Sequence, residues 1–137
     1  MPYDSVEAKD QFLRECRTTC RRNVAQLAIA HELEQTYSAS DAINWYTRSC
    51  FLFEMISRAL RSGDALILYK LRYFIVDMCK HLEFTAKTQS SWATHVYRGT
   101  VLAKDEVENL VVGSLVAATG FFSSSLDLQV AKSFIGV

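Results

Sequence analysis

The spacing of apolar residues changes near residue 87, and this change limits the folds open to the chain. Before it, apolar residues recur every three or four positions, which is typical of amphipathic helices. From Lys87 to Ala93 the chain turns polar, and short β-branched and aromatic runs follow, as in strands. We therefore predict an α+β fold, with a helical lobe over residues 1–86 and the first strands of a β-core over residues 94–137.

Composition favours one domain. The chain has 137 residues, 50% of them apolar, with one proline and five glycines, which leaves little material for a linker. The 15 basic and 15 acidic residues cancel, so charge gives no reason to expect a nucleic acid or an anionic membrane as partner. No basic and then apolar stretch follows Met1, so we expect no secretory signal and a cytosolic (cytoplasmic) protein.

Three long helices are expected in the first half. Asp4 and Glu7 have the spacing of a capping box, which predicts a helix that starts at Ser5 and runs to about Tyr37. A stretch rich in capping residues, Ser38–Asp41, follows it and predicts a break. The later apolar periodicities predict helices over Phe51–Leu60 and Ala65–Phe84.

Short strands are expected in the second half. Their predicted ranges are Thr94–Arg98, Leu115–Thr119 and Gly120–Ser124, with a short helix over Lys104–Leu110. A second interpretation stays open, because residues 109–126 carry no charge over a length close to the roughly 18-residue minimum of a transmembrane helix. The glycines, serines and β-branched residues of this run favour buried strands.

A run of hydroxyls links the last predicted strand to a short helix. Ser123–Ser125 follow the strand, and Asp127 precedes a segment with an apolar residue at every third position. Upstream, Arg98 and Gly99 end another predicted strand. Helix-start amides, serine hydroxyls and a forked guanidinium all suit phosphates, and a glycine lets a ligand approach the backbone. We therefore predict that these two strand ends form one nucleotide-binding site.

These residues resemble the first two signatures of the arginine-specific mono-ADP-ribosyltransferases, whose pattern is Arg, then Ser-Thr-Ser, then Glu-x-Glu. Tyr97-Arg98-Gly99 matches the first signature and Phe122-Ser123-Ser124-Ser125 the second, with Ser124 in place of the usual threonine. The helical half adds to the resemblance through residues 42–47 and 59–62, so that it extends from about Phe12 to Phe134.

The resemblance implies an ADP-ribosyltransferase-type β-core and an enzyme that transfers ADP-ribose from NAD to a protein arginine, releasing nicotinamide. NADP is a possible co-substrate, and a protein bearing an arginine is the acceptor. Arg98 and Gly99 would bind the dinucleotide, and Ser123 would contact its ribose and orient the catalytic glutamate. No Glu-x-Glu follows the serines before Val137. We therefore expect a fragment of a longer protein that binds NAD weakly and transfers nothing by itself.

Two further residues belong to the predicted site. Ser125 is placed there, and it is also expected to cap the following helix together with Asp127. Of Phe121 and Phe122, one is expected in the core and the other stacked on a flat ring such as nicotinamide. Phe122 is counted among the cofactor-binding residues.

No metal site is expected. The four cysteines, Cys16, Cys20, Cys50 and Cys79, are interpreted as reduced, semi-buried side chains. Cys16 and Cys20 share a helical face that a metal could use, but no second pair at ligand spacing accompanies them.

Two other functions stay open beside the transferase. The chain could be a non-catalytic helical binding module, whose docking would survive an Arg98→Ala substitution. It could also be a helical protein anchored in a membrane through residues 109–126.

Overall fold

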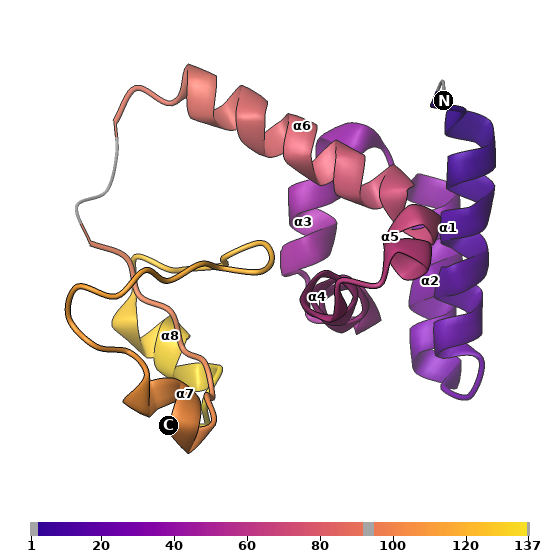
Figure 1. Ribbon diagram of the computed structural model, residues 1–137. Coiled ribbons are helices and arrows are strands. Elements are labelled where there is room, and N and C mark those ends of the chain that lie inside the picture. The colour runs from indigo at the N-terminus through magenta and orange to yellow at the C-terminus, as the bar shows by residue number, and fades with distance from the viewer. Residues whose placement is uncertain (1–2, 92–94, 137) are drawn as a thin grey trace. The chain divides into compact units, whose positions relative to one another are not determined.

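The chain divides into two compact units, Met1–Gln89 and Ser90–Val137, and the computed structural model describes residues 3–91 and 95–136 (Figure 1). The first unit contains α1 (Ser5–Cys20), α2 (Val24–Thr36), the 3₁₀ helix η1 (Ala39–Asp41), α3 (Ala42–Thr47), α4 (Phe51–Ser62), α5 (Ala65–Lys70) and α6 (Arg72–Thr88). The second unit contains α7 (Lys104–Glu108) and α8 (Leu128–Ser133).

The expected continuous helix over Ser5–Tyr37 is two helices. Its predicted start is confirmed, because Asp4 Oδ1 accepts the amides of the first turn at 2.9 and 3.1 Å. α1 nevertheless ends at Cys20, and Asn23 starts α2 by accepting the Gln26 amide at 3.1 Å. An asparagine side chain that bonds the backbone competes with helix continuation, although the apolar stripe runs through the break.

The predicted helix over Ala65–Phe84 is also divided. Leu71 has φ −96° and ψ 3°, and it separates α5 from α6. Leu71 is only 1% exposed, so we attribute the break to the packing of Leu71 in the core, which overrides its local preference for a helix. The predicted helix over Phe51–Leu60 is confirmed as α4, which ends at Gly63 in the left-handed conformation at φ 64°.

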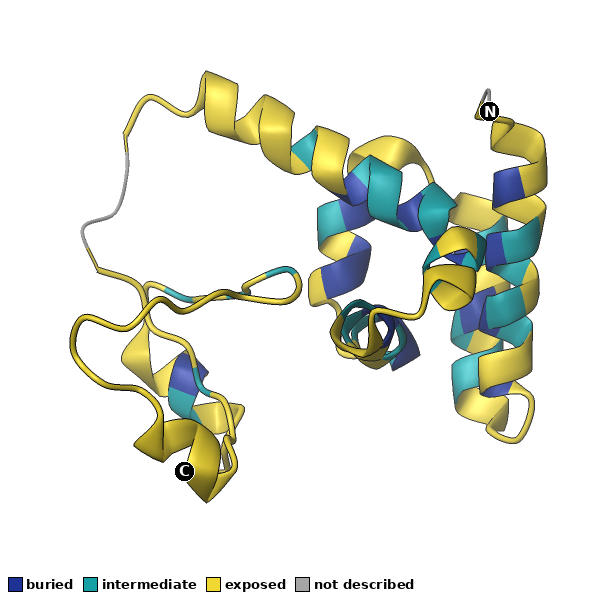
Figure 2. Cartoon of the chain, viewed as in Figure 1, coloured by how far each residue is buried: buried dark blue, intermediate teal, exposed yellow. Residues whose placement is uncertain are grey.

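Aromatic side chains lie at the centre of the helical unit. Phe12 of α1 and Phe74 of α6 are fully buried, and their ring centroids lie 5.6 Å apart. Tyr37 lies 6.5 Å from the Phe12 ring and 5.9 Å from the Phe74 ring. The buried positions of this unit occur on α1, α2, α3, α4 and α6 (Figure 2) and at Leu71. Each fully buried large apolar side chain stabilises the fold by roughly 1.5–3 kcal/mol.

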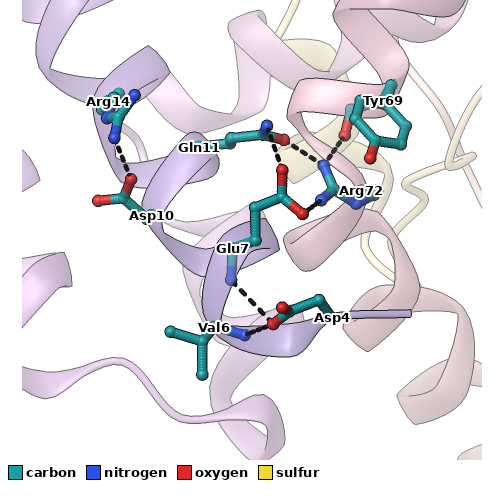
Figure 3. Close-up of polar contacts among 8 residues, drawn as sticks. All are labelled: Asp4, Val6, Glu7, Asp10, Gln11, Arg14, Tyr69 and Arg72. Atoms are coloured by element: carbon teal, nitrogen blue, oxygen red, sulfur yellow. Dashed lines mark hydrogen bonds and ion pairs between the residues drawn. The ribbon is translucent and has the colours of Figure 1, made fainter. Parts of the chain in front are cut away.

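Arg72 connects α6 to α1 (Figure 3). Its guanidinium donates to the side-chain oxygen of Gln11 and to the carbonyl oxygen of Tyr69, the latter at 2.7 Å. It also lies 3.8 Å from the centroid of the Tyr69 ring, and its Nη2 is 3.8 Å from Glu7 Oε2. Glu7, predicted as half of a capping box, therefore contacts Gln11 and Arg72 through its carboxylate.

The Tyr37 hydroxyl makes the helical unit sensitive to alkaline pH. It donates to Asp77 Oδ2 at 2.8 Å. Burial, followed by this hydrogen bond and the Asp77 charge, raises the pKa of Tyr37 well above its ordinary value of 10.0. The folded protein thus holds the proton more tightly than the unfolded chain does. We expect this stabilisation in full below about pH 10 and its progressive loss as the pH rises further.

Urea denaturation between about pH 8 and pH 11 measures this loss. Tyr37→Phe should reduce the fall in unfolding free energy above pH 10. Some fall should remain, because burial also raises the pKa of Tyr3 and Tyr73. An equally steep fall in the variant and the parent would show that Tyr37 is not the group responsible.

The predicted α+β fold is wrong, since the described residues contain helices and irregular segments but no sheet. Their β-pairing is an isolated antiparallel bridge between Tyr97 and Ser125. The ranges Leu115–Thr119 and Gly120–Ser124 form no strand. Of the range Thr94–Arg98, Thr94 lies outside the described residues and the rest contributes only the Tyr97 bridge. β-branched residues favour a strand only beside a neighbouring strand, and the described chain supplies one pairing position.

Most large apolar side chains of the second unit are exposed. Val112 and Leu115 are 103% and 99% exposed, whereas Ala131 of α8 is 5% exposed. The predicted helix over Lys104–Leu110 is confirmed as α7, which ends at Glu108. Residues 109–126 form no helix, and within residues 3–91 and 95–136 no helix is both long and apolar enough to span a membrane.

Candidate nucleotide-binding site

The predicted site lies where two extended segments of the second unit meet. Tyr97 and Ser125 exchange both backbone hydrogen bonds, each 2.8 Å long. This bridge fixes the register between residues 95–99 and residues 121–127. Arg98 is therefore adjacent to the serine run.

Arg98 joins the two segments through its side chain. Its Nη1 donates to the carbonyl oxygen of Ser123 at 2.8 Å, and its guanidinium carbon lies 4.5 Å from the centroid of the Phe122 ring. The contact is thus with the Ser123 backbone and not with its hydroxyl. A guanidinium has five N–H donors, and among the described residues only the Ser123 carbonyl accepts from this one. The remaining donors of Arg98 can bind an anion.

Exposure alternates along the serine segment, as it does in an extended chain. The half-buried residues are Phe121, Ser123 and Ser125, and the exposed ones are Phe122, Ser124 and Leu126. Ser123 and Ser124 therefore differ in exposure, as neighbours in an extended segment do. Phe122 is 63% exposed, and the Arg98 guanidinium lies over its ring. Of Phe121 and Phe122, Phe122 is therefore the ring that a ligand can reach.

Ser125 and Asp127 order the start of α8. The Ser125 hydroxyl accepts the Asp127 amide at 3.0 Å, and Asp127 Oδ1 accepts the Gln129 amide at 2.8 Å. The predicted capping role of both residues is confirmed. The Ser125 hydroxyl is thus engaged within the chain, which leaves the hydroxyl of Ser123 for a ligand. No hydrogen bond from any described residue engages that hydroxyl.

Gly99 allows α8 to lie directly against the Arg98 segment. A Cβ atom at this position would be 2.0 Å from the carbonyl oxygen of Ala131 and 3.0 Å from its carbonyl carbon. Ala131 is the buried residue of α8. Gly99 thus permits a backbone contact between α8 and the Arg98 segment that a side chain would prevent.

Two pockets lie in the helical unit. One has a volume of about 460 Å³ and is lined by residues of α1, α2, α4 and α5, among them Cys20, Phe51 and Met55. The other, of about 310 Å³, is lined by Trp45 and Arg48 and their neighbours. Neither includes a residue of the predicted NAD site, which is an exposed corner and not one of these cavities.

Neither the 460 Å³ pocket nor the contact between Arg98 and Phe122 was predicted from the sequence. That contact depends on the register of the bridge, which only the structure supplies. Within residues 3–91 and 95–136, no three His, Cys, Asp or Glu side chains group closely enough to hold a metal ion.

Comparison of the chain with protein-family models, with curated proteins and with solved structures gave no match.

Proposed function

We propose that this chain carries the dinucleotide-binding residues of an NAD-dependent protein-arginine mono-ADP-ribosyltransferase. The supporting observation is the hydrogen bond from Arg98 to Ser123, which brings residues of the two signatures together. NAD is the proposed co-substrate, with NADP as a possible substitute, and an arginine of another protein is the proposed acceptor. A cytosolic location belongs to the proposal, because four free cysteines suit a reducing compartment.

Each residue of the candidate site has a distinct role in this proposal. The uncommitted donors of Arg98 bind the diphosphate through charge-assisted hydrogen bonds. The exposed ring of Phe122 supports a flat ring of the ligand, and the Ser123 hydroxyl bonds a ribose. Transfer of ADP-ribose passes through a positively charged sugar that requires a nearby carboxylate. Because no Glu-x-Glu follows Ser125 in these 137 residues, we expect them to bind NAD without transferring ADP-ribose.

Substitution of Arg98 tests the proposal. Each charge-assisted hydrogen bond contributes roughly 1.5–3 kcal/mol, so Arg98→Ala should weaken NAD binding about 10-fold to 100-fold. Arg98→Lys keeps the charge but loses the fork, and it should fall between the parent and the alanine variant. Isothermal titration calorimetry with NAD measures both effects.

Arg22→Ala is the matched control for charge. It removes one exposed guanidinium from the turn between α1 and α2, and it should leave NAD affinity within about twofold of the parent. Equal losses of NAD affinity in the Arg22 and Arg98 variants would mean that the affinity depends only on the net charge of the chain. Unchanged affinity after Arg98→Ala would refute the proposed role of Arg98.

A helical interaction module is the second candidate function. The observation in its favour is that the helical unit has its own aromatic core and a 460 Å³ pocket, both independent of the candidate NAD site. A protein partner bound by this unit should still bind after Arg98→Ala, whereas binding that requires NAD should be lost.

A further inference from the structure

Three of the four cysteines lie on α1 or directly before α4, two helices that contact each other. Cys16 and Cys20 are one helical turn apart on α1, and each is 1% exposed. Cys50 is the N-cap residue of α4 and is half-buried. The fourth, Cys79 on α6, is exposed. This part of the helical unit therefore contains two buried thiols and one that solvent can reach.

Hydrogen bonds connect the end of α1 to the start of α4. The Asn23 amide donates to the Cys20 carbonyl at 2.9 Å, and the Asn23 side chain accepts the Gln26 amide at 3.1 Å. The Gln26 side chain in turn accepts the Phe51 amide at 3.0 Å. Cys20 and Phe51 also line the same 460 Å³ pocket. Cys50 directly precedes Phe51, so these contacts place Cys50 at the same corner as Cys20.

The electrostatics of the thiols agree with this placement. Burial raises the pKa of Cys20, and the nearby Cys50 raises it further. Burial also raises the pKa of Cys16 strongly, with Cys20 as the next cause and Cys50 as a smaller one. Cys20 and Cys50 are thus close enough for the charge of one to affect the other.

We propose that Cys20 and Cys50 form a redox-sensitive pair that closes to an intramolecular disulfide in the presence of a disulfide oxidant such as glutathione disulfide. The half-buried Cys50 reacts first: its thiolate attacks one sulfur of the oxidant and releases one glutathione thiolate. The Cys20 sulfur then loses its proton and attacks the Cys50 sulfur of this mixed disulfide. A second glutathione thiolate leaves, so two protein thiols are oxidised and one oxidant disulfide is reduced.

Geometry excludes Cys16 as the natural partner of Cys20. Residues four apart in a helix have Cβ atoms about 5–6 Å apart, whereas a disulfide requires about 3.8 Å. Cys50 directly precedes a different helix, α4, and is not held to this spacing. Its exposure also gives the oxidant access that the buried thiols lack.

The full chain carrying Cys79→Ser provides the test, because that substitution removes the exposed thiol of α6. Incubation with glutathione disulfide should lower the intact mass by about 2 Da, and peptide mapping should join the peptide of Cys20 to that of Cys50. The bridge closes a loop from α1 to α4, so it should raise the melting temperature of the helical unit by about 10 °C, reversibly with dithiothreitol.

Cys50→Ser in the same background should abolish the mass loss and the rise in melting temperature. Serine is a favourable N-cap residue, so α4 should form normally, which circular dichroism verifies. Cys16→Ala is the matched control, and it should leave both effects in place. Glutathione adducts without an internal bond, or a crosslink that joins Cys16 to Cys50, would overturn the proposal.

Discussion

Replacing Gly99 by alanine should displace α8 from the Arg98 segment and abolish NAD binding. The new Cβ would lie 2.0 Å from the Ala131 carbonyl oxygen, a backbone atom that cannot move without its helix. Overpacking of this kind costs about 1–3 kcal/mol. The second unit has little other core to offset that cost, since most of its large apolar side chains are exposed. Amide signals of Ala131 in an NMR spectrum should shift or disappear, and NAD titration should give no heat.

Gly113→Ala separates this contact from the general effect of removing a glycine. Gly113 has φ 90°, which strains an alanine, but no atom lies within 4 Å of a Cβ placed there. The Ala131 signals and the NAD affinity should therefore match those of the parent. If Gly99→Ala left the Ala131 signals unchanged, the close packing of α8 on the Arg98 segment would be wrong.

The helical unit should lose most of its stability when Phe74 is replaced by alanine. The Phe74 side chain is 0% exposed and stacks on Phe12 at an interplanar angle of 16°. Phenylalanine-to-alanine substitutions in a core cost about 3–5 kcal/mol, and small domains have only about 5–15 kcal/mol in total. The urea concentration at the midpoint of unfolding, measured by far-ultraviolet circular dichroism, should therefore fall.

Phe84→Ala is the control on the same helix. Phe84 also lies in α6 but is 67% exposed, so its loss should change the unfolding free energy by less than about 0.5 kcal/mol. If the two substitutions lowered the unfolding free energy by similar amounts, the core would not lie where α1 and α6 meet at Phe74.

Local signals in the sequence were sufficient for several helices of the first unit. Asp4 caps the predicted start of α1, and the apolar spacing predicted α4 to within a few residues. The breaks at Asn23 and Leu71 were not predicted, because the apolar stripe continues through both. The break at Asn23 depends on a side chain that competes for backbone amides, and the break at Leu71 on burial between helices.

The absence of strands in the second unit could not be derived from local sequence in the same way. The residues from Leu115 to Ser124 have strand-like composition, but composition does not supply a neighbouring strand. The described chain pairs only at Tyr97 and Ser125, so the predicted β-core is replaced by irregular segments.

For the candidate site, the sequence predicted which segments meet but not which atoms are in contact. The resemblance led to the expectation that Arg98 and Ser123 are adjacent, and they are. It did not indicate that the guanidinium bonds the Ser123 carbonyl and covers the Phe122 ring. It also left open whether Phe121 or Phe122 is accessible, and the structure shows Phe122 as the exposed one.

The central claim is that Arg98 and Ser123 belong to a dinucleotide site. The most direct test is to titrate the isotopically labelled chain with NAD and to measure the amide chemical shifts. Binding at the corner should shift the signals of Arg98, Gly99, Phe122 and Ser123 in a saturable manner at concentrations up to about 5 mM. The signals of the helical unit should stay in place. Absence of any shift at the corner, or shifts confined to the pocket between α1 and α4, would contradict a dinucleotide site built on Arg98 and Ser123.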